Sequence, residues 1–316
     1  MIVTVTMNPA IDRMIYVDHF HAGAVNRSCQ TRVYAGGKGI NVSRVVRLLG
    51  GDTCAMGVVA GDTGKQLCAL LEREGLPQKM YSLGDDAYTR VNVKVYAKNG
   101  DTTDINEPGP CISPEQAESF VNEFEAVLSP GDTVVLSGSL CGGIDSHFYL
   151  QLAQTAKKRG CAVIADASGE NLGLLVQAKP TFVKPNLKEL EQLLGRRLAT
   201  FPQICEAARA LLHSGAQKVV VSLGEKGALM VTPQRVLYAP ALEVSVKGTV
   251  GAGDSMVAGL AFSMGKKASD EQALKLACAC ATACVCSGAT GDITADMIRS
   301  YEKQIRTEEW KEEASV

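Results

Sequence analysis

Short apolar runs alternate with amphipathic stretches along most of the chain. Runs of about five apolar, often β-branched residues predict strands, and apolar positions three or four residues apart predict helices. The predicted strands are residues 2–6, 53–59, 133–137, 161–166, 181–184 and 218–222, and the predicted helices are 41–49, 65–74, 114–128, 147–158, 187–194 and 204–213. Buried strands separated by helices are typical of a parallel sheet covered on both faces. We therefore predict a single α/β domain over residues 1–316.

Two segments, residues 11–20 and 89–107, depart from this alternation because each has an extended pattern without a helix. Polar and apolar residues alternate along 90–96, which predicts a half-buried antiparallel strand, and residues 98–101 have the composition of a hairpin turn. A small sheet of this kind is not stable alone. We expect it to project from the main domain as a lid, and we expect two copies of the chain to form a homodimer through it.

The last third of the chain has a different pattern. Residues 228–231 and 236–239 predict a hairpin, and the residues from about 252 onward are mostly helical. The charged segment 302–316 predicts a solvated helix end.

Composition and charge exclude several classes of protein. Of the 316 residues, 46% are hydrophobic and 21% are charged, as in an ordinary globular protein. The net charge is −2 and no Lys/Arg cluster occurs, so we expect no nucleic-acid partner and no anionic membrane surface. No apolar run reaches about 18 residues, and the N-terminal residues lack a signal-like pattern. We therefore expect a cytoplasmic protein.

Eleven cysteines raise the question of a metal or disulfide role. Disulfides are not expected in a large cytoplasmic protein. Cys278, Cys280, Cys284 and Cys286 lie in an alanine-rich helical stretch, where a rotation of about 100° per residue scatters them around the axis. We expect these four to be buried small apolar side chains. The four histidines have neither zinc-site spacing nor a recognisable catalytic triad.

Gly251-Ala252-Gly253-Asp254 precedes a stretch with helical spacing. Small residues leave several N–H groups at the positive end of that helix free to bind an anion. Asp254 beside them could accept a proton from a hydroxyl while an oxyanion gains charge. A tight turn before a helix would explain the same four residues without any function.

Residues 36–41 form a second glycine-rich loop before a helix, in which Lys38 supplies a cation. A Walker A loop is excluded because Arg32 stands where its first glycine is required. A dinucleotide fingerprint is excluded as well. Its third glycine is replaced by Val42 in this loop and by Met256 after the second loop.

Several polar residues lie where predicted strands end, which is the ligand-binding edge of a parallel sheet. Asp12 is placed to accept hydrogen bonds from sugar hydroxyls, or to form a local turn. Ser139 follows a strand and Arg90 lies in the predicted lid, and either could bind a phosphate. A surface ion pair is the alternative role for an isolated arginine.

Asn186 and Glu189 have the spacing of a capping box at a helix start, which would account for both residues. The alternative places them near nucleotide phosphates and a hydrated Mg²⁺. Residues 222–227 contain two glycines that would let a flat or anionic group approach the backbone, or that form a simple β-turn.

Taken in order, these motifs resemble the PfkB/ribokinase family of sugar kinases. The resemblance runs from Asn8 to about Thr290, and its most specific parts are residues 36–41 and 249–255, with 184–189 and 222–224 between them. It implies a ribokinase-like three-layer α/β sandwich with a mostly parallel central sheet and a small projecting β-sheet lid. Segments 8–12, 89–94 and 104–110 are most similar to the branch that acts on fructose 1-phosphate and tagatose 6-phosphate.

The resemblance also implies a role for each motif residue. Asp254 would be the base for the accepting hydroxyl, and Gly251, Ala252 and Gly253 would hold the charge that develops on the transferred phosphoryl group. Asp12, Gly37 and Asn41 would bind sugar hydroxyls, and Lys38, Arg90 and Ser139 the phosphate already on the substrate. Lys184, Asn186, Ser222, Gly224 and Gly227 would line the ATP site, Glu189 would act on Mg²⁺ through water, and residues 279–289 would pack near adenine.

The implied reaction is ATP-dependent phosphorylation of fructose 1-phosphate to fructose 1,6-bisphosphate. The nearest alternative is a tagatose-6-phosphate kinase that gives tagatose 1,6-bisphosphate. A non-catalytic sugar-phosphate sensor is an alternative of another class, but a sensor has no need of a base such as Asp254. Two positions depart from the family pattern: Cys141 stands where relatives often have proline, and Gly248 where some members have an Asp for a monovalent cation. K⁺ dependence is therefore left open, because a backbone carbonyl could serve in place of that Asp.

Overall fold

The computed structural model describes residues 1–167 and 169–311. A ten-stranded central sheet has the order β14-β13-β12-β11-β10-β9-β8-β1-β4-β5, and β11 through β5 are all parallel. The strands are β1 (Ile2–Thr6), β4 (Thr53–Val59), β5 (Gln78–Ser82), β8 (Thr133–Ser137), β9 (Ala162–Asp166), β10 (Phe182–Val183), β11 (Lys218–Ser222), β12 (Ala228–Val231), β13 (Val236–Ala239) and β14 (Glu308–Glu309). This architecture confirms the predicted α/β class and mostly parallel sheet.

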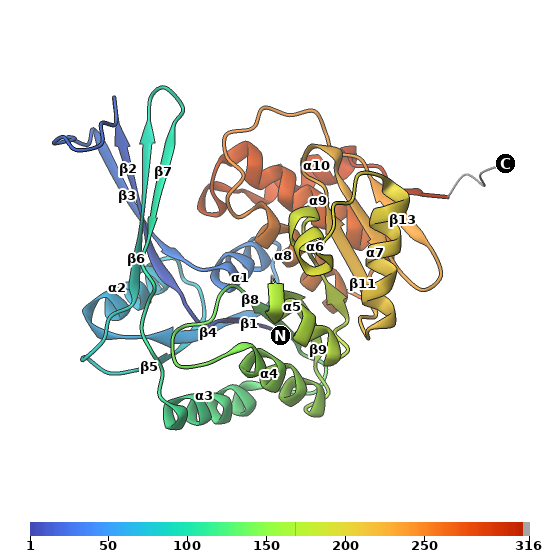
Figure 1. Ribbon diagram of the computed structural model, residues 1–316, viewed down its shortest axis with the longest axis horizontal. Helices are drawn as coiled ribbons and strands as arrows, with labels where there is room; N and C mark the ends of the chain where they lie inside the picture. Colours follow the sequence, from blue (N-terminus) through green and yellow to red (C-terminus); the bar gives the residue numbers. More distant parts are fainter. Residues whose placement is uncertain (168, 312–316) are drawn as a thin grey trace.

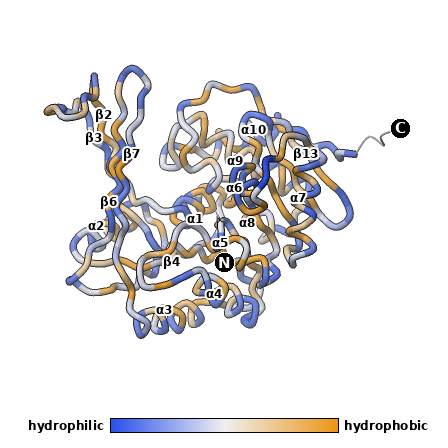
Figure 2. Tube along the Cα trace, in the orientation of Figure 1, coloured by the Kyte–Doolittle hydropathy of each residue, from blue (hydrophilic) through white to orange (hydrophobic). Residues whose placement is uncertain are grey.

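Helices cover both faces of the sheet and make three layers (Figure 1). One layer holds α3 (Pro114–Val127), α4 (Ser146–Lys158), α5 (Gly169–Gln177), α6 (Leu187–Leu194) and α7 (Phe201–His213), and the other α1 (Lys38–Leu48), α2 (Gly61–Arg73), α8 (Ala252–Gly265), α9 (Asp270–Ser287) and α10 (Ala295–Gln304). Successive side chains of a strand point to opposite faces, so Val134 and Leu136 pack in the first layer's core and Val135 in the second's. Central strands are therefore mostly apolar, with polar residues near their ends, such as Thr133 and Ser137 of β8 (Figure 2 colours the chain by hydropathy).

A separate four-stranded sheet, here called the lid, projects from the body (Figure 1). Its order is β3-β2-β6-β7, with β2 (Ala10–Val17), β3 (Gln30–Gly36), β6 (Arg90–Ala97) and β7 (Thr102–Asn106). Strands of this small sheet lie in both segments where the sequence predicted extended structure, but two details differ. Strand β2 ends at Val17, so residues 18–20 are not extended sheet, and β3 was not predicted from the sequence.

The register of the lid separates a polar face from an apolar face. Asp12 pairs with Asn92, and both line a cavity shared with the body. The next residues in register, Arg13 and Val93, point to the other face, where Val93 also pairs with Ile105 of β7. Ile105 is 58% exposed although it is a large apolar residue. The lid thus carries β-branched residues on the face that points away from the cavity.

The strand order fixes where a ligand site can form. In chain order, β4 and β5 are added to the sheet on one side of β1, and β8, β9, β10 and β11 are then added on the other side. The order of the strands therefore reverses at β1. In open parallel sheets such a reversal opens a crevice at the carboxyl ends of the strands. Glycine-rich and polar residues follow β1, β8, β10 and β11 at this edge, as predicted.

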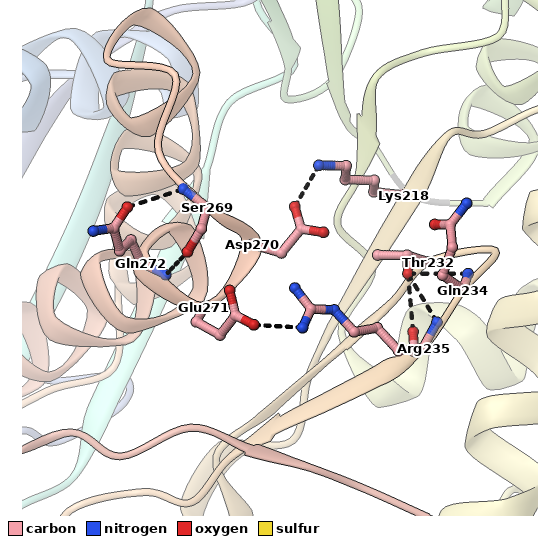
Figure 3. A network of polar contacts seen from close by, with 8 residues as sticks. All are labelled: Lys218, Thr232, Gln234, Arg235, Ser269, Asp270, Glu271 and Gln272. Carbon is pink, nitrogen blue, oxygen red and sulfur yellow. Dashed lines mark hydrogen bonds and ion pairs between the residues drawn. The ribbon is translucent and has the colours of Figure 1, made fainter.

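A polar network anchors α9 at the end of the sheet opposite this crevice, where β11 begins (Figure 3). Asp270 and Glu271, in the first turn of α9, form ion pairs with Lys218 at the start of β11 and with Arg235 beside β13. Ser269 and Gln272 form a capping box at the same helix end. The network fixes the helix whose last turns reach the predicted nucleotide site.

The end of the chain corrects one prediction. Segment 302–316 was expected to be a solvated helix end, but α10 ends at Gln304 and β14 then pairs with β13. Trp310 stacks on Phe201 with ring centroids 6.5 Å apart, because an aromatic pair buries apolar surface at the sheet edge. Residues 312–316 lie outside the described part of the chain.

The cysteine prediction is largely confirmed. Cys278, Cys280 and Cys284 are buried in α9, whereas Cys286 is half-buried. Burial raises the pKa of the Cys278 and Cys280 thiols, which keeps them protonated and apolar in character. The described residues contain no group of three or more metal-ligating side chains placed to hold a metal ion. Within the same residues, none of the helices has the length and apolarity needed to cross a membrane.

Candidate active site

The site is organised by the N-terminus of α8. Gly251 is the N-cap residue and has a φ of 83°, in the left-handed region that glycine adopts without strain. A Cβ at this position would lie 2.6 Å from Cγ2 of Thr290, so no larger residue fits. No side chain caps this helix end. The N–H of Ala252 donates to the carbonyl oxygen of Thr249 at 3.3 Å, whereas the N–H groups of Gly253 and Asp254 have no such backbone partner and remain available to an anion.

Asp254 lies in the first turn of α8 and is 6% exposed. Its Oδ2 accepts a hydrogen bond of 2.8 Å from Nδ2 of Asn41, which lies near the start of α1. Asn41 comes to this place because α1 begins directly after the glycine-rich loop, with Gly37 as its N-cap. The two glycine-rich loops, far apart in sequence, thus meet at one carboxylate.

Asp166 is the buried centre of charge beside this carboxylate. It ends β9, and its Oδ1 and Oδ2 form ion pairs with Nζ of Lys184 at 3.1 Å and with Nζ of Lys38 at 3.5 Å. The hydroxyl of Ser137, at the end of β8, donates to Oδ2 at 2.8 Å. Asp166 therefore fixes two ammonium groups at the carboxyl edge of the sheet.

The two carboxylates have different proton affinities. Burial and the charge of Asp166 raise the pKa of Asp254 to about 6, although Asn41 and the two lysines act in the opposite direction. Burial also acts to raise the pKa of Asp166, but Lys184 and Lys38 outweigh it and hold the value at about 2. The charge of Asp166 raises the pKa of Lys38. Asp254 is thus the carboxylate able to exchange a proton near neutral pH.

Three cavities adjoin along the carboxyl edge of the sheet, and Asp254 lines the middle one. This central cavity measures about 420 Å³. It shares Gly37, Lys38 and Arg90 with an inner cavity of about 310 Å³. It shares Asn186, Ser222 and Gly253 with an outer cavity of about 620 Å³.

The predicted site residues all line this row of cavities. The central cavity contacts Asp12, Gly37, Lys38, Asn41, Arg90, Lys184, Asn186, Glu189, Ser222, Gly251, Gly253 and Asp254; the inner cavity adds Ser139, and the outer cavity adds Gly224, Gly227 and Ala252. Of the stretch 279–289, Ala281, Thr282 and Val285 line the outer cavity. The structure therefore brings the predicted residues together in space.

Arg90 is presented to the inner and central cavities without a carboxylate partner. Its guanidinium donates to the carbonyl oxygen of Asn8, at 2.9 Å from Nη2, and to that of Glu107. Among the described residues it forms no ion pair, so the surface ion pair considered from the sequence is not present. Burial lowers the pKa of Arg90 although the charge of Asp12 acts in the opposite direction, so the cation is only partly compensated in this place. Such a cation suits an anionic ligand.

The outer cavity has the lining expected for a flat, partly apolar ligand. Apolar side chains such as Leu242, Val246 and Met256 form much of its wall. At its junction with the central cavity, Asn186 and Glu189 form the predicted capping box at the start of α6. The backbone N–H of Asn186 donates to Oε2 of Glu189 at 2.8 Å. The expectation that Asn186 and Glu189 form a capping box is thus confirmed, and Glu189 also lines the central cavity.

The lid contributes its polar face to the central cavity. Nδ2 of Asn92 donates to Oδ1 of Asp12 at 3.0 Å, which orients the Asp12 carboxylate. Lys94 is buried beside them and lines the same cavity. Sequence reasoning assigned no individual role to Asn92 or Lys94. The alternation along β6 could have identified both, because they share the face of Arg90.

Asp166 was also missed from the sequence. An acidic residue at the end of an otherwise apolar parallel strand is a usable signal, because that end faces the crevice. The identity of its partners was not accessible, since Lys38 and Lys184 lie on other elements.

Comparisons with known proteins agree with this geometry. A profile of the family described as "pfkB family carbohydrate kinase" matches residues 5–296. The 1-phosphofructokinase of Bacillus subtilis is 37% identical over 276 residues, covering 87% of this chain and 89% of that protein. The tagatose-6-phosphate kinase of Staphylococcus epidermidis is 33% identical over 308 residues, covering 96% and 98%. The crystal structure of Escherichia coli phosphofructokinase-2 in complex with fructose-6-phosphate matches with a TM-score of 0.88 and 29% identity, covering 96% and 98%.

Proposed function

Since this chain belongs to the pfkB family of carbohydrate kinases, and is thus a phosphotransferase with an alcohol group as acceptor, we propose that it phosphorylates fructose 1-phosphate on its 6-hydroxyl with ATP. The product is fructose 1,6-bisphosphate. One observation carries the proposal: the Asp254 carboxylate lines the middle of three adjoining cavities and lies at an uncapped helix N-terminus. The adjoining cavities match a nucleotide on one side and a phosphorylated sugar on the other.

The proposed mechanism uses positioning and charge compensation. Asp254 accepts the proton of the sugar 6-hydroxyl while that oxygen attacks the γ-phosphorus, and ADP leaves. The N–H groups at the start of α8 stabilise the negative charge on the transferred phosphoryl oxygens. Lys184 supports this, because its Nζ is 3.4 Å from where a Cβ of Gly253 would lie. Lys38, which is held by Asp166, provides a second cation.

The phosphate already on the sugar is assigned to the inner cavity. Arg90 and Lys38 supply positive charge there, and Ser139 supplies a hydroxyl from the loop after β8. Asp12, oriented by Asn92, and Asn41 are assigned to the sugar hydroxyls in the central cavity. The adenine is assigned to the outer cavity, between α9 and the residues that follow β13.

Mg²⁺ is the proposed metal ion, and the donor set fits it in one particular way. Mg²⁺ keeps several waters and needs few protein carboxylates when phosphates are present. Glu189 lines the central cavity, and one of its oxygens already accepts the backbone N–H of Asn186, a residue that lines both the central and the outer cavity. Glu189 would therefore act through water. When bound, the ion would neutralise phosphate charge.

The substrate assignment is tested by comparing two sugar phosphates. Tagatose 6-phosphate is the second candidate, because a tagatose-6-phosphate kinase is similar over nearly the whole chain. ADP release is measured with each sugar phosphate under the same conditions. We expect the higher kcat/KM for fructose 1-phosphate. A higher value for tagatose 6-phosphate reverses the assignment, and no ADP release with either contradicts it.

We also propose that the protein is a homodimer joined through the lid. Ile15, Val93 and Ile105 lie on the face of the lid that points away from the cavity. Isolated small sheets with one apolar face are not stable in water, and a second copy would bury this face. The lid of each subunit would then be held over its own cavity by its partner.

A cytoplasmic location completes the proposal. The buried thiols of Cys278, Cys280 and Cys284 fit a reducing compartment, where disulfides do not form. Fractionation of cells that produce the protein would test this, and recovery of the activity outside the cytoplasm would contradict it.

A further inference from the structure

The side-chain amide of Asn41 makes contacts on both sides. Its Nδ2 donates to Asp254, as described above. Its Oδ1 accepts a hydrogen bond of 2.8 Å from Nη1 of Arg44 and one of 2.9 Å from the hydroxyl of Thr290. Arg44 also donates to Oγ1 of Thr290 at 3.2 Å, so this hydroxyl is directed toward the amide oxygen. Both lone-pair positions of Oδ1 are thereby occupied.

Arg44 is itself rigidly held. Its Nε and Nη2 donate to the two carboxylate oxygens of Glu74 at 2.8 and 3.1 Å, and Nη2 also donates to the carbonyl oxygen of Ala35 at 3.0 Å. Glu74 follows α2, and Ala35 lies in β3 at the base of the lid. The guanidinium is planar and has donors only, so it cannot accept a hydrogen bond from the Asn41 amide nitrogen.

We propose that Arg44 is a positioning residue that fixes the orientation of the Asn41 amide, with its oxygen toward the guanidinium and its nitrogen toward Asp254. A flipped amide would place N–H groups against Arg44 and Thr290 and an oxygen against the carboxylate. Arg44 excludes that state. The inference rests on the proposed role of Asp254 as the base, and it adds the group that holds the ionised base in place through Asn41.

The expected consequence is a change in the proton affinity of Asp254. The groups that face it are Asn41 from α1, Lys38 at the start of α1, Lys184 after β10, and Asp166 at the end of β9. Cys284 on α9 also interacts with it, but burial raises the pKa of this thiol to about 11, so it is neutral at the pH of the test. Asn41 and the lysines favour the ionised carboxylate, whereas Asp166 and burial disfavour it. Loss of the Asn41 hydrogen bond therefore favours the protonated form, and less of the enzyme has an ionised base at a given pH.

The test compares the pH dependence of kcat in four proteins at saturating substrates: wild type, Arg44→Met, Thr290→Val and Glu74→Gln. We expect the acidic limb of R44M to move to higher pH and its kcat at neutral pH to fall by about tenfold. T290V removes one of the two donors to Asn41 and moves the limb in the same direction by less. Titration of the substrate phosphate is common to all four profiles, so it cancels in the comparison.

Glu74→Gln is the matched control for stability. It weakens the ion pair that holds Arg44 but leaves the guanidinium next to Asn41, so its acidic limb stays at the wild-type pH. If the acidic limbs of the pH profiles of R44M and T290V both lie at the same pH as that of the wild type, the proposal is overturned. If R44M does not fold, T290V alone decides, because replacing a hydroxyl by a methyl group keeps its shape. If Asp254→Asn loses turnover but the acidic limbs of the R44M and T290V pH profiles do not move, only this inference is refuted. If D254N still turns over, the proposed role of Asp254 as the base is refuted.

Discussion

Asp166 and Asp254 face the same two lysines, but their pKa values shift in opposite directions. Asp166 forms ion pairs with Lys38 and Lys184, which hold its pKa at about 2 in spite of burial. Burial and the nearby charge of Asp166 raise the pKa of Asp254 to about 6. Two carboxylates whose environments separate their proton affinities in this way are suited to different tasks. Asp166 fixes two cations, and Asp254 is the carboxylate that we propose exchanges a proton.

The first prediction concerns the pH dependence of turnover. Because Asp254 must be ionised to accept a proton and its pKa is raised to about 6 in the free chain, kcat/KM should fall on the acidic side of that pH. The slope should approach about tenfold per pH unit, as for a single essential base. The measurement is kcat/KM from pH 5 to pH 8. A kcat/KM that is constant down to pH 5 would show that no group with this pKa is required.

The second prediction concerns Asp166. In Asp166→Asn the charge that holds Lys38 and Lys184 is removed, so both ammonium groups lose their fixed positions. We expect KM to rise for both ATP and the sugar phosphate, and kcat to fall on the order of tenfold or more, because both cations line the cavity in which we propose that the phosphoryl group is transferred. Steady-state kinetics with each substrate varied in turn measures these changes.

Asp132→Asn is the matched control for this variant. Asp132 is also a buried aspartate in an ion pair, but its partner is the N-terminal amine, and it lies just before β8, at the edge of the sheet away from the cavities. We expect D132N to lower thermal stability and to keep wild-type KM values. Equal KM changes in the two variants would show that the effect of D166N is one of general stability.

The third prediction links the site to stability. The pKa of Asp254 is raised from 3.8 to about 6 on folding, so the folded state loses stability as the pH rises through this interval and the buried carboxylate ionises. Asp254→Asn removes that cost. We expect D254N to be more stable than wild type by on the order of 1–3 kcal/mol at pH 8. Urea unfolding at pH 8 and pH 4 measures the difference, which should shrink at pH 4. A less stable D254N at pH 8 would contradict the assignment.

The fourth prediction concerns the lid. Val93→Asp places a carboxylate in the middle of the apolar face of the lid, and burying it unpaired in a dimer would be costly. We expect V93D to be monomeric at micromolar concentration by size exclusion with light scattering, and the wild type to be dimeric. Thr102→Asp, on the opposite face of β7, should remain dimeric. A monomeric wild-type protein rules out the lid interface.

The central strands could be predicted accurately because burial on both faces makes them short, continuous apolar runs. Residues 2–6, 53–59, 133–137 and 218–222 are strands with the predicted bounds. Strand β3 was missed because its first residues, Gln30, Thr31 and Arg32, are polar and exposed. Its place in the sheet depends on pairing with β2, a long-range contact that local pattern does not encode.

The candidate site was predictable in its residue types but not in its internal contacts. Asp254, Asn41 and Lys184 were identified because each belongs to a motif at a strand or helix end. Asp166 and Arg44 belong to no such motif, and their importance comes from partners on other elements. Only the folded chain places the Arg44 guanidinium against the Asn41 amide. Contacts between a site residue and the residue that positions it are set by tertiary structure and have no local sequence pattern.

The measurement that tests the account most directly is ATP turnover by Asp254→Asn with fructose 1-phosphate. The amide keeps the size and the hydrogen-bonding oxygen of the carboxylate but cannot take up the hydroxyl proton. We expect a loss of kcat of roughly 10²–10⁴-fold, with binding of ATP and of the sugar phosphate retained in a direct titration. A D254N protein that binds both ligands and turns over at a rate close to that of wild type would contradict the proposal that this carboxylate is the base.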